Sequence, residues 1–138
     1  MKPLSHGSAL VEFALAWPIV LLLVLGSVEL AVWASEAAAA RSAAIAGARA
    51  GTVAGASADV AAAVAVRSLS ASLIGVRAAV WCPGHATAPP PVWVCATDQG
   101  SALQVDVGGT VPALVPLVSG SGLPLKAHVA LNKETFAK

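Results

Sequence analysis

The hydrophobic pattern begins with a long, almost uninterrupted apolar segment. From Phe13 to Ala34 the only polar side chains are Ser27 and Glu29, and no polar helical face is visible. This run of about 22 residues extends roughly 33 Å as a helix, which is enough to cross the ~30 Å hydrocarbon core of a bilayer. A central helix in a soluble bundle would need other long apolar helices around it, and the rest of the chain lacks them. The pattern therefore predicts a membrane-inserted helix.

An alanine-rich region follows and predicts that this helix continues for several turns. Alanine, the strongest helix former, dominates Glu36–Gly51. Gly47, Gly51 and Gly55 recur every four residues and share one helical face, which would allow close approach of a neighbouring backbone. We favour the simpler interpretation that these glycines only weaken the helix, and we expect it to break near Gly55.

A second helix is predicted from Ala58 to Ile74. Ser57 is a suitable N-cap, and Asp59 places negative charge at the positive end of the helix dipole. Gly75 follows the last turn, where a glycine commonly ends a helix.

After Gly75, proline, glycine and β-branched residues replace alanine, and the pattern predicts strands. The four predicted strands are Val76–Cys82, Pro91–Thr97, Ala102–Val107 and Leu123–Leu131. The first two flank the loop PGHATAPP, whose prolines exclude a helix and hold the loop extended. We therefore expect an α+β fold in which a small antiparallel sheet packs against the outer helix.

Composition and charge exclude several functional classes. The chain is 57% hydrophobic and only 11% charged, with a net charge of +1. Average soluble domains are about 45–50% apolar and about 25% charged, so the departure is large. The arginines are scattered singly, and there is no tyrosine, so neither a basic patch nor a set of stacking aromatics favours nucleic acid as a partner.

No motif indicates catalysis or a cofactor. The sequence has no glycine-rich phosphate loop, no paired carboxylates at useful spacing and no glycine-flanked serine nucleophile. His85 lies in the proline loop, His128 falls on the polar face of a predicted strand, and Asp98 and Asp106 stand isolated in the sequence. We expect a protein that is not an enzyme and has no catalytic residue.

The two cysteines, Cys82 and Cys95, favour a disulfide if the domain is exported. The bond would close a loop of about 14 residues, worth ~3 kcal/mol in the chain-entropy model. An alternative uses both thiolates as zinc ligands with His85, in a Cys-x-x-His spacing. That site would need a fourth ligand, for which His128 is the only candidate. We favour the disulfide and expect no metal.

Glu12 helps to decide whether the apolar segment is kept as a membrane anchor or removed as a signal peptide. A carboxylate in lipid is costly and needs a partner, and the hydrophobic core of an ordinary signal peptide has no use for one. Cleavage between Gly7 and Ser8 would create a free amine on Ser8, which an axially shifted neighbouring helix could set against Glu12. Glu12 and Ser8 would then fix the register between subunits. Pro18 lacks a backbone donor and should bend the helix.

The residues GSALVEFALAWPIVLLLVLGSVEL (7–30) resemble the start of type IV pilin-like proteins, and more closely the TadE-like family of tight-adherence pilus biogenesis. The shared features are a Gly followed by small residues, the run V-E-F-A-L, a proline six residues after the Glu, a leucine-rich run and a second acid, here Glu29. The segments AARSAAIAGARAG (39–51) and LPLKAHVALNKE (123–134) are also similar to that family.

This resemblance implies a pilin-like (pseudopilin) minor subunit that acts in pilus assembly. A prepilin peptidase would cut between Gly7 and Ser8. The other implied partners are pilin-like subunits and the polytopic membrane platform of pilus assembly, in addition to membrane lipid.

The resulting organisation is a leader peptide (1–7), a transmembrane helix (8–35), an alanine-rich helical region (36–75) and a small extracytoplasmic β-rich region (76–138). Lys2, before the apolar segment, favours a single pass through the cell membrane with the N-terminus in the cytoplasm. The alternative is a small exported binding domain, released by signal peptidase just ahead of Ser35, with Trp81 and Trp93 in its contact patch.

Overall fold

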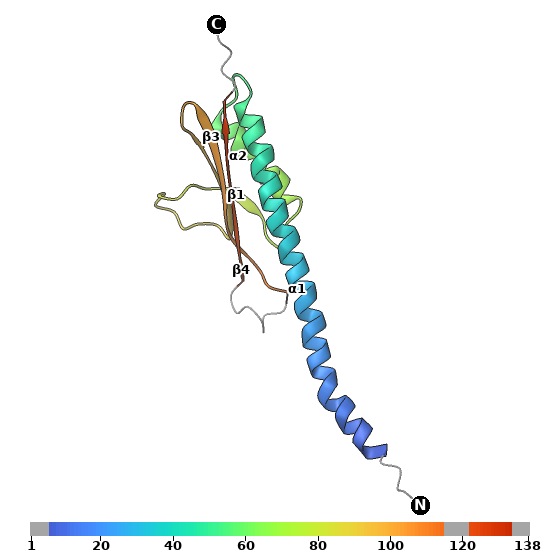
Figure 1. The fold of residues 1–138 in the computed structure, drawn as a ribbon. Coiled ribbons are helices and arrows are strands. Elements are labelled where there is room, and N and C mark those ends of the chain that lie inside the picture. The colour runs from blue at the N-terminus through green and yellow to red at the C-terminus, as the bar shows by residue number, and fades with distance from the viewer. Residues whose placement is uncertain (1–5, 115–121, 134–138) are drawn as a thin grey trace, which may run out of the picture.

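The computed structural model describes residues 6–114 and 122–133. The elements are α1 (His6–Thr52), α2 (Ala58–Ser70), β1 (Ala78–Val80), β2 (Val92–Asp98), β3 (Ala102–Val111) and β4 (Leu123–Asn132). Figure 1 shows the C-terminal half of α1 packed with α2 and the sheet, while its N-terminal half extends away from both. The predicted α+β class is confirmed, with two helices followed by a small sheet.

The long helix α1 joins the predicted membrane segment and the alanine-rich segment in one element of 47 residues. It passes through Pro18 without interruption and curves gently in Figure 1. The bend that we expect at Pro18 itself stays a prediction. The break near Gly55 is confirmed, because α1 ends at Thr52 and Gly55 adopts a φ of 82°, a left-handed conformation that favours glycine.

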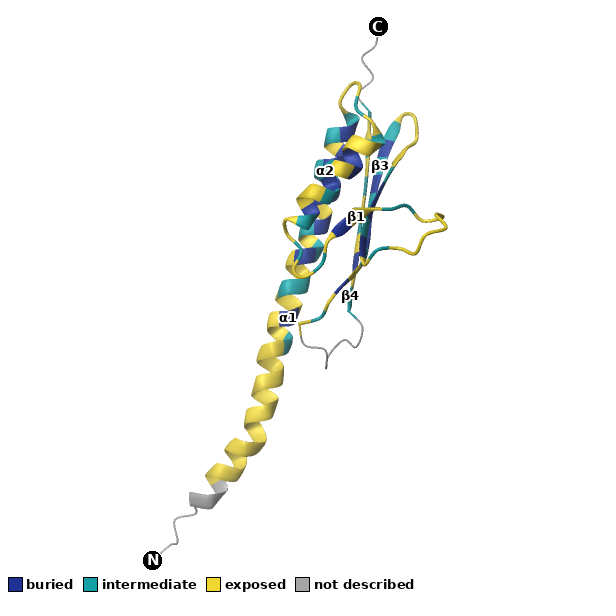
Figure 2. Cartoon of the chain, turned by 180° about the vertical axis from the view of Figure 1, so that it is seen from behind, coloured by how far each residue is buried: buried dark blue, intermediate teal, exposed yellow. Residues whose placement is uncertain are grey.

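Exposure changes sharply along α1. From Ala9 to Val28 every residue except the half-buried Gly26 is exposed, as the yellow half of the helix in Figure 2 shows. Glu29 is the first buried residue. Buried residues then continue along the face that packs on the rest of the domain: Glu36, Ala40, Ala43, Ala44, Gly47, Ala48 and Gly51.

The glycines of α1 allow its backbone to approach α2 closely. A Cβ atom on Gly47 would lie 2.6 Å from the carbonyl oxygen of Ala61 and 2.7 Å from Cβ of Ala65. A Cβ atom on Gly51 would lie 2.7 Å from Cβ of Ala61. Our interpretation that these glycines only weaken the helix is therefore wrong at both positions. The sequence spacing was compatible with close packing, but the partner helix was not visible in it.

Helix α2 begins as predicted and ends early. The Ser57 side chain accepts a hydrogen bond from the Val60 amide at 3.4 Å, which confirms the N-cap, and Asp59 lies in the first turn. The helix stops at Ser70 rather than at the predicted Ile74. Beyond this point the amides of Ser72 and Leu73 both donate to the Leu69 carbonyl oxygen, and the Ile74 amide donates to the Glu36 carboxylate at 3.2 Å instead of continuing the helix.

The sheet has the order β1-β2-β3-β4, and it is antiparallel except at one edge. Strand β1 pairs with β2 in parallel, so our expectation of a wholly antiparallel sheet is wrong for that pair. The extended proline-rich loop between the strands explains the difference. A parallel connection needs about a dozen residues to return to the same end of the sheet, and residues 81–91 supply nearly that number.

Both helices cover the same face of the sheet, and the hydrophobic core lies between the helices and that face. The buried residues from the strands alternate along the chain and are Val92, Val94, Leu103, Val105, Val107, Val111 and Leu125. They meet the small side chains of α1 and α2. The opposite face of the sheet carries Trp93, Asp106 and His128, none of which is in this core.

Candidate functional site: the membrane anchor and its junction with the domain

The exposed half of α1 has the properties of a membrane anchor. Among the described residues, α1 is the one helix that is long and apolar enough to cross a membrane. Large apolar side chains point outward over this half, with Leu10 72% and Leu23 68% exposed. Soluble monomers rarely expose apolar patches larger than a few hundred Å². Residues 9–28 span roughly 30 Å at ~1.5 Å per residue, which matches a bilayer core. The apolar helix is therefore a candidate single-pass anchor.

Three side chains on one face of α1 mark where the anchor joins the domain. Glu29 is 6% exposed and Glu36 is 4% exposed, and Trp33 lies between them. The Trp33 indole Nε1 donates to the carbonyl oxygen of Pro124 in β4 at 3.0 Å. The Glu36 carboxylate accepts a hydrogen bond from the Ile74 amide, a charge-assisted bond that is partly buried. The anchor therefore enters the domain as a continuous helix, with no linker between the two.

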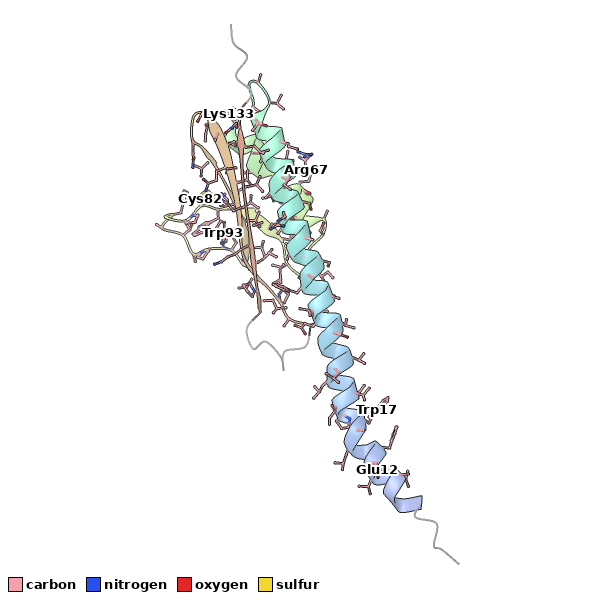
Figure 3. All side chains as sticks on the ribbon, viewed as in Figure 1. Glu12, Trp17, Arg67, Cys82, Trp93 and Lys133 are labelled. Carbon is pink, nitrogen blue, oxygen red and sulfur yellow. A yellow bond between two sulfur atoms is a disulfide. The ribbon has the colours of Figure 1, made fainter. Side chains whose placement is uncertain are left out.

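The residues predicted to act in processing and register lie at the start of α1. Gly7 and Ser8 belong to its first turns, and Glu12 follows one turn later. Figure 3 shows Glu12 close to the N-terminal end of the helix, far from the sheet. Most of the predicted leader, residues 1–5, lies outside the described residues. Pairing between Glu12 and the Ser8 amine of a neighbouring subunit involves a second copy of the chain, so it stays a prediction.

The disulfide between Cys82 and Cys95 is confirmed. Their Cα atoms are 4.8 Å apart. Cys95 lies in β2, and Cys82 follows the end of β1, whose Val80 is opposite Val94. The bond therefore closes the proline-rich loop and joins the two parallel strands. It also takes both sulfur atoms out of the alternative zinc site, so the interpretation of these cysteines as metal ligands is wrong.

The strand register brings together side chains that are isolated in the sequence. Asp106 and His128 lie directly opposite each other in β3 and β4, with Oδ1 and Nδ1 2.6 Å apart. Asp98 forms an ion pair with Lys133. That lysine, together with the Gly100 amide, lowers the pKa of Asp98 below its usual value. Neither pair was predicted, because both join residues more than twenty positions apart in the sequence.

Within residues 6–114 and 122–133, no group of three or more His, Cys, Asp and Glu side chains is placed to hold a metal ion. His85 lies in the exposed proline-rich loop, where its amide donates to the Cys82 carbonyl at 3.4 Å. The described residues thus present two features for function, the anchor helix and the polar face of the sheet.

Comparison with known proteins connects the first of these features to a family. The family model described as TadE-like protein matches residues 7–49, which confirms the TadE-like resemblance of this segment. The matched segment includes the whole exposed half of α1 and the junction with the domain. No curated protein and no solved structure matches the chain.

Proposed function

We propose that this protein is a TadE-like, pilin-like membrane subunit that acts in the assembly of tight-adherence type IV pili. The proposal depends mainly on the difference between the exposed N-terminal half of α1 and its buried C-terminal half. A bare apolar half of bilayer length continues without a break into a half that forms the core of a folded domain, and the family match covers this junction. Such a helix can hold the domain at the membrane and also present an apolar surface to the helices of other subunits.

Processing by a prepilin peptidase would complete the anchor. Cleavage between Gly7 and Ser8 leaves an amine about one helical turn, roughly 6 Å, before Glu12. A neighbouring subunit displaced by that distance would place its amine level with this carboxylate. Because isolated charges are costly in lipid, the pair is favoured over either charge alone, and it selects one axial register. The proposed partners are therefore other pilin-like subunits, with the membrane platform of pilus assembly.

The proposed location is the cell membrane, with a cytoplasmic N-terminus and an extracytoplasmic domain. The disulfide supports this orientation, because such bonds form and persist in oxidising compartments outside the cytoplasm. Because no linker separates the anchor from the domain, Glu29, the first buried residue of α1, would lie close to the outer membrane surface if residues 9–28 fill the hydrocarbon core.

The structure supports this proposal over release of the domain by signal peptidase. A cut ahead of Ser35 would fall inside α1, between Trp33 and Glu36, both of which contact the domain. The released domain would lose the hydrogen bond from Trp33 to Pro124 and the buried side chain of Glu29. A retained anchor keeps both.

N-terminal sequencing of the mature protein from the membrane fraction tests the proposal directly. A chain that begins at Ser8 is expected. A chain that begins near Ser35 and is recovered outside the membrane would overturn the proposal in favour of the exported domain.

A glycine pair supplies the matched control. Gly7→Leu should leave an uncleaved chain and abolish pili in a deletion strain complemented with this variant. Gly26→Leu makes the same change further along the same helix, where an added Cβ meets nothing within 4 Å, and should leave cleavage unchanged. Normal pili with Gly7→Leu would contradict the processing step.

A further inference from the structure

The sheet face turned away from the helices carries an organised set of side chains that the proposed function does not use. Register places Trp93, Gly108 and Lys126 in one row across β2, β3 and β4. The next row contains Asp106 and His128. Figure 3 shows Trp93 on the side of the sheet opposite α1.

The Trp93 indole packs closely against the sheet. It lies over Gly108, where an added Cβ would come within 2.7 Å of the ring atom Cε2. Trp81 meets it edge-on, with ring centroids 5.6 Å apart. Trp81 is itself fixed, because its Nε1 donates to the carbonyl oxygen of Thr87 at 3.2 Å. These contacts hold a half-buried aromatic surface in place before any ligand arrives.

A chain of hydrogen bonds orients the polar groups beside this surface. Asp106 accepts from Gln104 Nε2 at 2.7 Å through Oδ2, while its Oδ1 pairs with Nδ1 of His128. Gln99 Nε2 in turn donates to Gln104 Oε1 at 2.7 Å. The His128 side chain is 60% exposed, so its second ring nitrogen faces a position that a ligand can reach. The polar groups are thus held in position, as they are in preformed sites.

Trp93, Asp106 and His128 line a groove of about 680 Å³, together with Pro83, Lys126 and the exposed Arg41, which comes from α1. That volume lies within the usual range for small-ligand sites, ~300–1,000 Å³. Neither Lys126 nor Arg41 forms an ion pair with any described residue. The groove therefore combines an aromatic wall, one carboxylate and two cations that form no ion pair among the described residues.

We propose that this groove binds an acidic oligosaccharide. The apolar face of a pyranose ring packs on the Trp93 indole, which offers a wide, rigid apolar surface. The sugar hydroxyls exchange hydrogen bonds with Asp106 and His128. The sugar carboxylate is paired by Lys126 and Arg41, in charge-assisted bonds stronger than those between neutral groups. A neutral sugar leaves both cations unpaired, and a simple inorganic anion leaves the aromatic wall unused.

Titration of the full-length protein with two sugars of equal length tests the proposal. The protein is kept in a polyoxyethylene detergent, because sugar-headed detergents would compete for the groove. Tetragalacturonic acid is the acidic probe and maltotetraose the neutral one. The readout is the set of indole ¹H–¹⁵N signals from the four tryptophans. We expect tetragalacturonic acid to shift the Trp93 signal saturably and to bind at least about tenfold more tightly than maltotetraose.

Charge variants locate the binding. Lys126→Gln and Arg41→Gln should each weaken binding of tetragalacturonic acid by about tenfold, as expected for a lost charge-assisted bond. Arg67→Gln is the matched control, since Arg67 is exposed on α2, outside the groove and away from Trp93 in Figure 3. It should bind as the unaltered protein does. An equal loss in all three variants would show attraction by overall charge and would overturn the proposal.

Two further outcomes would also reject it. If maltotetraose binds as tightly as the acidic sugar, the two cations have no role in recognition. If linear polyphosphate or a short single-stranded oligonucleotide shifts the Trp93 signal with equal affinity, the groove is a general anion site rather than a sugar site. Near-ultraviolet circular dichroism of each variant confirms that the tryptophan cluster remains folded.

Discussion

The two halves of α1 differ in the size of their apolar residues: the N-terminal half is rich in large side chains and the C-terminal half in small ones. The N-terminal half presents large apolar side chains, such as Leu10 and Leu23, and all but one of its residues from 9 to 28 are exposed. The C-terminal half buries alanine and glycine, such as Ala44 and Gly47. Lipid is fluid and fills gaps around large side chains. A neighbouring helix is rigid, so its backbone can come close only where side chains are small.

This contrast teaches that hydrophobicity alone does not say what covers a helix. Both halves are apolar by composition, and both lie in one unbroken element. Side-chain size separates them: the bulky half has no partner inside the domain among the described residues, whereas the small half has α2 and the sheet. Substitutions of the same type in the two halves should therefore have opposite consequences.

The largest difference is expected for glycine to leucine. Gly47→Leu forces a side chain into the backbone of α2, where even a Cβ atom lies 2.6 Å from the Ala61 oxygen. Overpacking against a rigid backbone should lower the free energy of unfolding by more than about 3 kcal/mol and the Tm of the domain by at least about 10 °C. Gly26→Leu, in open space on the exposed half, should leave that Tm unchanged. Near-ultraviolet circular dichroism on heating measures both, and equal Tm values would refute the size argument.

Loss of the disulfide should affect the domain and spare the anchor. Replacing Cys82 and Cys95 with serine releases a loop of about 14 residues, which should lower the free energy of unfolding by ~3 kcal/mol. Urea denaturation followed by tryptophan fluorescence measures the change. Membrane association under alkaline extraction should be unaffected, because the exposed half of α1 makes no use of the bond. A variant that leaves the membrane would show that the domain contributes to anchoring.

Acid-to-alanine substitutions separate assembly from stability. Glu36→Ala removes the acceptor of the partly buried hydrogen bond from the Ile74 amide and should lower the free energy of unfolding of the domain by about 1–3 kcal/mol. Glu12→Ala should leave domain stability unchanged, since Glu12 lies far from the sheet in Figure 3, but should impair pilus formation. Urea denaturation and counts of surface pili are measured on both variants. Normal pili with Glu12→Ala would remove the basis for the register proposal.

The smallest effect is a pH dependence confined to the tip of the domain. Hydrogen bonds from Lys133 and from the Gly100 amide lower the pKa of Asp98. A carboxyl with a lowered pKa adds stability above its unfolded pKa, near 3.8, and loses it as the pH falls through the lower folded value. Asp98→Asn should therefore reduce the drop in Tm between pH 5 and pH 2, and Lys133→Gln should do the same. An unchanged pH profile in both variants would argue against this coupling.

The local features of the protein were predictable from its sequence because neighbouring residues determine them. The length of the apolar run predicted a helix long enough to cross a membrane, Ser57 predicted the start of α2, and Gly55 predicted the end of the long helix. With only two cysteines in the chain, the disulfide had a single possible pairing, Cys82 with Cys95. Each of these inferences depends on composition, spacing or a capping residue within a few positions.

Features that depend on long-range contacts were decided by the tertiary structure alone. Four such features join segments that are distant in the chain. They are the parallel direction of β1, the close approach of α2 at Gly47, the pairing of Asp106 with His128 and the packing of Trp93 on Gly108. Periodicity places a residue on a face, but it does not say which residue of another strand lies opposite. That choice follows from register and packing, which fix every cross-strand neighbour at once.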